Sequence, residues 1–242
     1  MNGDAAEQFT AFDTSHQVAF LLLAAGALAL VWIGRATREV DPDDRIGRGL
    51  AVAVLALTLP LQVIYFTPGY WDLQTTLPLQ LCDLAAWISA YALWTHRSWA
   101  VGLTYYWGLT LTTQAIITPD LASSFPDPVF ILFWGMHLMV VWAAVYLTWG
   151  LGLAPDWRIY RTAVYATAAW AATIYTFNVT VGTNYGYLNA KPRTASILDL
   201  LGPWPWYVLA EISIIIAVWA LATWPWVSLA RRRGAYDVQH RS

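Results

Sequence analysis

Seven long apolar stretches dominate the chain, and each approaches the roughly 20 residues that a helix needs to cross a bilayer. They comprise residues 16–34, 48–66, 78–94, 99–118, 129–150, 159–181 and 204–228. Segments rich in proline, glycine and aspartate separate them, as in Pro126-Asp127-Pro128. Only 12% of the 242 residues are charged, against roughly 25% in soluble domains. We therefore predict an all-α polytopic membrane protein, in which residues 1–242 form a single domain, a bundle of seven transmembrane helices.

The basic residues divide unevenly between the two sides of this predicted bundle. Eleven of the 13 Lys and Arg residues fall in loops on one side or in the C-terminal tail, and only Lys191 and Arg193 fall on the other. Cytoplasmic loops are enriched in basic residues, so this division predicts a cytoplasmic C-terminus and an N-terminus outside. The net charge of −2 gives no basic field for nucleic acid, which we do not expect as a partner.

Polar residues inside the predicted helices are few, and ionisable groups at membrane depth are candidates for function. These residues are Asp83, His137 and Glu211, the neighbouring Cys82, and the amides Gln62, Gln80, Gln114 and Asn178. A rise of about 1.5 Å per residue puts His137 roughly 12 Å and Glu211 about 10 Å from the outer surface. The whole set falls in the outer half of the bundle. We therefore predict a polar pocket that opens towards the outer leaflet or the outer water.

The residue types in this pocket limit its chemistry. A retinal protein needs a lysine inside the bundle, and the only lysine is Lys191 in an outer loop. A catalytic zinc needs at least three ligands, and only one histidine lies deep, so we expect no metal and no cofactor. A thiol nucleophile with a histidine base is simpler. Cys82 would attack, His137 would take the proton, and Asp83 or Glu211 would orient the imidazole.

The connection 182–203 is the one long outer loop, and long loops in compact proteins are often functional. It carries Asn184, Tyr185, Lys191 and Arg193, which we expect to contribute to substrate binding together with Gln80, Gln114 and Asn178. A surface loop with tyrosines at the membrane interface is the structural alternative.

Several segments resemble the YwaF-like family of bacterial integral membrane proteins. They are Leu79-Gln80-Leu81-Cys82-Asp83-Leu84, Thr118-Pro119-Asp120-Leu121, Gly182-Thr183-Asn184-Tyr185-Gly186-Tyr187-Leu188, Lys191-Pro192 and Leu200-Leu201-Gly202-Pro203-Trp204-Pro205-Trp206-Tyr207. That family is similar to eukaryotic multi-pass enzymes that transfer or hydrolyse fatty acyl groups on lipids. The resemblance implies a bacterial cytoplasmic membrane protein with membrane lipids as substrate, a nucleophile at Cys82 and a histidine at His137.

Chemistry suggests further roles for the polar residues around that pair. The amides of Asn178 and Asn184 would stabilise the oxyanion of an acyl intermediate. Lys191 and Arg193 would hold a lipid phosphate.

Two other functions stay open from the residues alone. In a transporter or a small-ligand binding protein, Asp83, His137 and Glu211 would couple to protons or solutes. In a non-catalytic scaffold, the outer polar residues would pair off completely and leave no cavity. Protein partners are not identified by the sequence.

Overall fold

The computed structural model describes residues 12–119, 121, 123–192 and 196–239, and this part of the chain contains helices and no strands. The elements are α1 (Thr14–Thr37), α2 (Arg45–Tyr65), α3 (Leu81–Thr95), α4 (Ser98–Tyr106), η1 (Trp107–Thr112), α5 (Thr113–Ile117), α6 (Pro128–Val145), η2 (Tyr146–Gly150), α7 (Trp157–Val181), η3 (Tyr185–Tyr187), η4 (Ile197–Leu201) and α8 (Trp206–Gln239). The π-helix η1 joins α4 to α5 without a break, and the π-helix η2 extends α6. The predicted all-α class is confirmed for the described residues.

Four helices in the described part of the chain are long and apolar enough to cross a membrane. They are Thr14–Thr37, Arg45–Tyr65, Pro128–Gly150 and Trp206–Arg232. Helix α3 has 15 residues, about 22 Å at 1.5 Å per residue, and is shorter than the hydrocarbon core. The crossing of the membrane by α3, by α4 with η1 and α5, and by α7 stays a prediction, and so does the count of seven.

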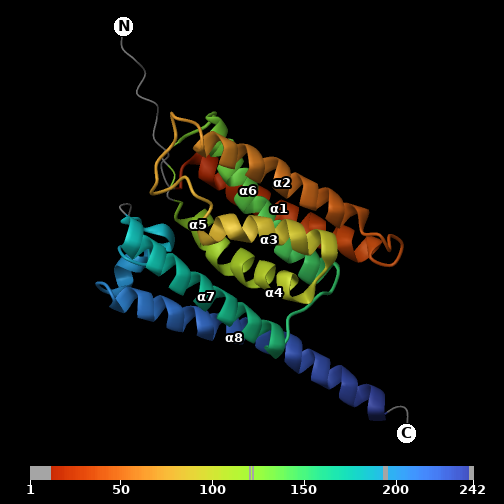
Figure 1. The fold of residues 1–242 in the computed structure, drawn as a ribbon. Coiled ribbons are helices and arrows are strands. Elements are labelled where there is room, and N and C mark those ends of the chain that lie inside the picture. The colour runs from red at the N-terminus through yellow and green to blue at the C-terminus, as the bar shows by residue number, and fades with distance from the viewer. Residues whose placement is uncertain (1–11, 120, 122, 193–195, 240–242) are drawn as a thin grey trace.

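Helix α6 lies at the centre of the bundle, between α1 and α2 on one side and α3 and α4 on the other (Figure 1). Of its most apolar window, 67% is buried inside the protein, against 17–28% for the other three spanning helices. Helices α7 and α8 lie side by side along one flank (Figure 1). The exposed apolar faces of the outer helices are what a lipid environment requires.

Side chains at the helix ends explain where several helices begin. Asp13 accepts a hydrogen bond from the His16 amide at the start of α1, and Asp156 accepts one from the Ile159 amide at the start of α7. Such caps satisfy backbone donors that have no partner within the helix. Helix α7 ends at Gly182, whose φ of +78° is a left-handed conformation that glycine adopts without strain.

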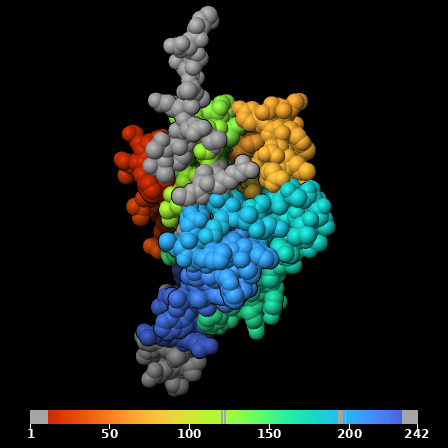
Figure 2. Space-filling view, turned by 90° about the vertical axis from the view of Figure 1, so that its left-hand side faces the viewer, coloured from red at the N-terminus to blue at the C-terminus, as the bar shows by residue number. Residues whose placement is uncertain are grey.

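The bundle has two ends, which we name the Gln80 end and the Asp44 end. At the Gln80 end, the loops before α3 and after α7 join, because Gln74 Nε2 donates to the Gly182 carbonyl and Leu77 N donates to Tyr185 Oη. Figure 2 shows these two segments side by side. The N-terminus of α1 lies at the same end, where His16 Nε2 contacts the Ile116 carbonyl at 2.8 Å.

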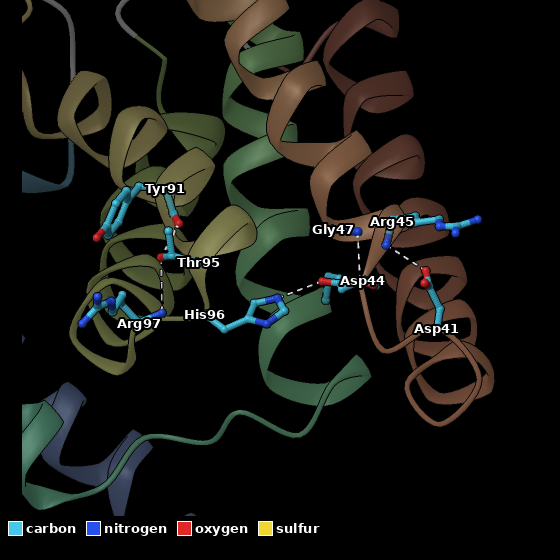
Figure 3. A network of polar contacts seen from close by, with 9 residues as sticks. Asp41, Asp44, Arg45, Gly47, Tyr91, Thr95, His96 and Arg97 are labelled. Atoms are coloured by element: carbon cyan, nitrogen blue, oxygen red, sulfur yellow. Dashed lines mark hydrogen bonds and ion pairs between the residues drawn. The ribbon is translucent and has the colours of Figure 1, made fainter.

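A network of hydrogen bonds around one buried carboxylate closes the Asp44 end (Figure 3). Asp44 is 8% exposed, and its Oδ2 accepts from His96 Nε2 at 2.8 Å. Its Oδ1 accepts from the Gly47 amide at 3.0 Å and from the Tyr146 hydroxyl. The network ties the start of α2 to the turn between α3 and α4 and to η2.

The hydrogen bonds to Asp44 also set its protonation. Burial alone would raise the pKa of Asp44, but the hydrogen bonds from His96, Tyr146 and Gly47 outweigh burial, and the pKa is lowered below its ordinary value. The carboxylate is therefore held ionised at neutral pH.

Arginines gather at the Asp44 end. Those with described side chains are Arg35, Arg38, Arg45, Arg48, Arg97, Arg158, Arg161, Arg231 and Arg232, and each lies on or beside a helix terminus at that end or on the last turns of α8. Lys191 lies at the Gln80 end, and Arg193 and Arg241 lie outside the described residues. The orientation of the termini across the membrane stays a prediction.

Candidate functional site

A cavity of about 320 Å³ lies at the Gln80 end of the bundle, and α2, α3, η1, α5, α6, α7, α8 and the loop 182–203 all contribute to its walls. Six of the predicted site residues line it: Gln80, Cys82, Asp83, Gln114, His137 and Glu211. The sequence predicted that these side chains share a pocket because they lie at similar depths on separate helices, and the structure places them in one cavity.

His137 is the most deeply buried polar group of the cavity, at 1% exposed. Its Nδ1 lies 2.8 Å from the Phe133 carbonyl, one turn earlier on α6. Because a carbonyl oxygen can only accept, Nδ1 must carry the hydrogen, and the neutral ring keeps its lone pair on Nε2. Nε2 has no hydrogen-bond partner among the described residues. The group that orients the imidazole is thus a backbone carbonyl, where we had expected Asp83 or Glu211.

Cys82 lies in the first turn of α3, next to the Gln80 N-cap. The dipole of a helix N-terminus favours negative charge on a sulfur at this position, whereas an ionised Asp83 opposes it. Asp83 is held in place as part of a capping box, because its Oδ2 accepts from the Gln80 amide at 3.2 Å. The sulfur and His137 Nε2 line the same cavity without a hydrogen bond between them.

Three further polar side chains offer unused groups to the cavity. Gln80 Oε1 accepts from the Gly186 amide at 2.8 Å, which fixes the side chain and leaves its NH₂ group without a described acceptor. The side chains of Gln114 and Glu211 make no hydrogen bond to any described residue. A cavity wall that carries unpaired polar groups is typical of a binding or catalytic site.

The amides of Asn178 and Asn184 do not line the cavity, because both are used to fold the loop after α7. Asn178 Nδ2 donates to the Tyr185 carbonyl, and its Oδ1 accepts from Thr183 Oγ1 and Tyr185 N, each at 2.9 Å. Asn184 Nδ2 donates to the Ala190 carbonyl at 2.8 Å. Because neither amide lines the cavity, the structure does not support the expectation that they stabilise an oxyanion there.

Tyr185 is also structural in its contacts. It is fully buried, and its hydroxyl donates to the Leu73 carbonyl at 2.7 Å while accepting from Leu77 N. It therefore locks the loop 182–203 to the segment before α3, and it does not reach the cavity.

Lys191 lies beside the cavity wall, since its neighbour Pro192 lines the cavity. Its Nζ is 3.6 Å from Asp199 Oδ1 and 5.7 Å from the centre of the Tyr207 ring. Arg193, the other residue proposed for phosphate, lies outside the described residues.

Trp170 is a cavity residue that the sequence did not mark. It lines the cavity from α7, and its Nε1 donates to the Leu79 carbonyl at 3.1 Å, which joins α7 to the segment before Cys82. Gly186 packs against its ring, and a Cβ at Gly186 would come within 2.4 Å of Trp170. Trp170 is one of 16 tryptophans in the chain, so nothing in the sequence sets it apart.

Within the described residues, no group of three or more His, Cys, Asp or Glu side chains could hold a metal ion. The described side chains give the cavity a thiol, an imidazole, two carboxyls and two amides, together with the hydroxyls of Tyr65, Thr75, Thr118, Thr167, Tyr187 and Ser196.

Comparison with known proteins gives one match. The model of the TMEM164 family matches residues 11–223. No curated protein and no solved structure matches the chain. The match covers every helix that lines the cavity, from α2 to the first half of α8. The chain therefore belongs to the TMEM164 family of multi-pass membrane proteins.

Proposed function

We propose that this protein moves fatty acyl groups on membrane lipids, as an acyltransferase or esterase, with Cys82 as nucleophile and His137 as general base. One observation carries the proposal: the unpaired, buried Nε2 of His137 shares a cavity with the only thiol of the chain. A buried nitrogen without a partner costs stability, and such a cost is typical of a group kept for chemistry.

The reaction balances with these two side chains alone. His137 Nε2 takes the proton from the Cys82 thiol as the sulfur forms a bond to the carbonyl carbon of an acyl ester. The carbon–oxygen bond to the leaving alcohol breaks, and that oxygen takes the proton back from Nε2. An acceptor hydroxyl, from a second lipid or from water, then gives its proton to Nε2 and attacks the thioester. The sulfur leaves and recovers the proton.

Neighbouring residues would assist these steps. The free NH₂ groups of Gln80 and Gln114 are the amides available to stabilise the oxyanion, in place of Asn178 and Asn184. Asp83 would position Cys82 by capping α3, and Glu211 would accept a hydrogen bond from the acceptor hydroxyl. Lys191 would attract a lipid phosphate beside the cavity, and the same role is proposed for Arg193 from its place in the sequence alone.

The topology we propose has all seven helical stretches crossing the membrane, with the Gln80 end outside. The gathering of arginines at the Asp44 end supports it. The resemblance to bacterial membrane proteins supports a location in the bacterial cytoplasmic membrane. The cavity would then act on lipids of the outer leaflet.

The two alternatives have less support. A scaffold predicts a closed bundle with all polar groups paired, whereas the cavity holds about 320 Å³ and unpaired groups. A transporter needs a path towards the Asp44 end, and below the cavity the fully buried Trp219 fills the space between α8 and η1.

The test is acyl capture by purified protein in lipid nanodiscs with radiolabelled phospholipid. Because Cys82 is the only cysteine, a hydroxylamine-sensitive acyl label on wild-type protein reports that thiol alone. We expect a label on wild type, a much weaker one on His137→Gln, and none on Cys82→Ala. Intrinsic tryptophan fluorescence checks that the variants fold. Lipid turnover by Cys82→Ala at the wild-type rate would overturn the proposal.

A further inference from the structure

Two helix faces with the same residue spacing border the cavity on its α5 and α8 side. Leu111 of η1, Gln114 and Ala115 of α5 and the following residue Thr118 line it on one side, and Val208, Glu211, Ile212 and Ile215 line it from α8. Both sets have the spacing i, i+3, i+4, i+7, which in the α-helix α8 marks a single face. Each face carries one polar side chain, Gln114 or Glu211, among apolar or small neighbours. We name the space between these faces the α5–α8 slot.

The slot opens to the outside of the protein at α8. Ile212 lines the cavity and is also 44% exposed. It lies six residues after the start of α8, about 9 Å along the helix. Leu209, Ile214 and Ile216 beside it are exposed too, which on a helix apolar enough to span a membrane means contact with lipid. We therefore expect hydrocarbon around this opening.

Beyond Ile215, towards the Asp44 end, the same face of α8 packs against the bundle and leaves no opening. Trp219, one turn beyond Ile215, is fully buried, and its Nε1 donates to Thr110 Oγ1 at 3.0 Å. Next, Thr223 Oγ1 bonds the Tyr106 hydroxyl at 2.7 Å, and Trp226 Nε1 donates to the Tyr105 hydroxyl. The half of α8 near the Asp44 end is thus fixed to α4 and η1. The half beside the cavity is held at its start, where the Tyr207 hydroxyl donates to the Tyr187 carbonyl, and at Ile216, whose carbonyl accepts from the Tyr160 hydroxyl of α7.

We propose that the acyl chain of the lipid substrate enters the cavity sideways, from the bilayer, through the α5–α8 slot. The chain would lie against Leu111, Ala115, Ile212 and Ile215, with its carbonyl beside Cys82 and its head group at the surface near Lys191. This inference rests on the proposed function, because it assigns the path by which the lipid reaches the same thiol. A soluble acyl donor would have to enter from the water side, where the loop 182–203 supplies Gly186, Tyr187 and Leu188 to the cavity wall.

The test compares two thiol reagents on protein in nanodiscs. N-hexadecyl iodoacetamide partitions into the bilayer, and iodoacetamide stays in water; both alkylate Cys82 irreversibly. The variant Ile212→Trp fills the slot with an indole. The matched control is Ile214→Trp, which adds the same ring to an exposed position of α8 that does not line the cavity.

We expect Ile212→Trp to slow alkylation by the hexadecyl reagent by about tenfold or more, because the chain loses the space it needs. Alkylation by iodoacetamide should change less than about twofold, and Ile214→Trp should match wild type with both reagents. Equal rates of alkylation by the hexadecyl reagent in Ile212→Trp and Ile214→Trp would overturn the proposed entry through the slot. Failure of this reagent to alkylate Cys82 in wild type would overturn it as well. If alkylation follows the expected pattern and wild type turns over no lipid, the proposed function falls and the slot stands.

Discussion

Each end of the bundle holds a histidine and carboxyl groups, but the hydrogen bonding of these groups differs between the two ends. At the Asp44 end, His96 and Tyr146 both bond Asp44, and the Gly47 amide completes its hydrogen bonding. At the Gln80 end, Asp83 accepts from the Gln80 amide, but the buried His137 Nε2 has no described partner, and the half-buried Glu211 carboxyl has none either. A paired buried network supports the fold, whereas unpaired buried groups cost stability. The contrast teaches that the polar groups at the Asp44 end pair with one another, whereas the cavity at the Gln80 end keeps some of its polar groups unpaired.

The largest effect is expected from His137→Gln at the Gln80 end. Loss of the general base should lower lipid turnover by about 10²- to 10⁴-fold. The melting temperature should stay close to that of wild type, because Nε2 contributes no hydrogen bond to the fold. Turnover in nanodiscs and melting by tryptophan fluorescence measure the two quantities. A variant that keeps wild-type turnover would show that the unpaired nitrogen is not the base.

Asp44→Ala should show the reverse pattern, with a large loss of stability. Removing the carboxylate leaves His96, Tyr146 and the Gly47 amide without their shared acceptor, at a cost of about 3 kcal/mol in the free energy of unfolding. Asp43→Ala is the matched control, because Asp43 is the neighbouring carboxylate and is exposed. Denaturant titration in mild detergent gives both values. Equal stability of Asp44→Ala and Asp43→Ala would show that the Asp44 network does not stabilise the fold.

The stability of the protein should fall in acid because of Asp44. Its pKa is lowered in the folded state, so its contribution is fully present above the unfolded value of about 3.9 and is lost as the pH falls through the lower folded value. Melting temperatures between pH 6 and pH 3 should drop most steeply below about pH 4. In Asp44→Asn this part of the slope should be missing. A parallel pH profile for the variant would assign the acid loss to other carboxyls.

The smallest effect is expected from Glu211→Leu, and it should have the opposite sign to that of Asp44→Ala. The substitution removes a carboxyl without a described partner from the cavity wall and should stabilise the protein by about 1 kcal/mol. Melting in the same detergent measures the change. The variant Glu211→Gln removes the charge and keeps a polar side chain, so it separates the two effects. A loss of stability in both Glu211→Leu and Glu211→Gln would contradict the prediction and would mean that this carboxyl has a partner in the membrane.

The sequence predicted the site by depth but not by orientation. The rise per residue and the order of the helices were enough to bring Cys82, His137 and Glu211 to one cavity. The rotation of a side chain about its helix depends on tertiary contacts, so the bond from His137 to the Phe133 carbonyl was not predicted. The use of Asn178 by its own loop was missed for the same reason.

The Asp44 network was not predicted from the sequence, for a different reason. Asp44 lies in an acidic, proline-containing turn and His96 in the polar turn after α3, where charged residues are ordinarily solvated. Their pairing joins residues 52 positions apart, and only the packing of α2 against α3 reveals it. The α-class and the helix positions followed from the apolar stretches, whereas the π-helical turn Trp107–Thr112 has no signal in the pattern.

The position of Trp219 limits the length of acyl chain that the slot can hold. If an acyl chain lies along α8 in the slot, it runs from the level of Glu211 to the indole that closes the same face, eight residues further on, or about 12 Å. A longer chain must turn out between the helices and finish in the bilayer. The protein would then contact only the segment of the chain next to the carbonyl, and would tolerate differences in the remainder.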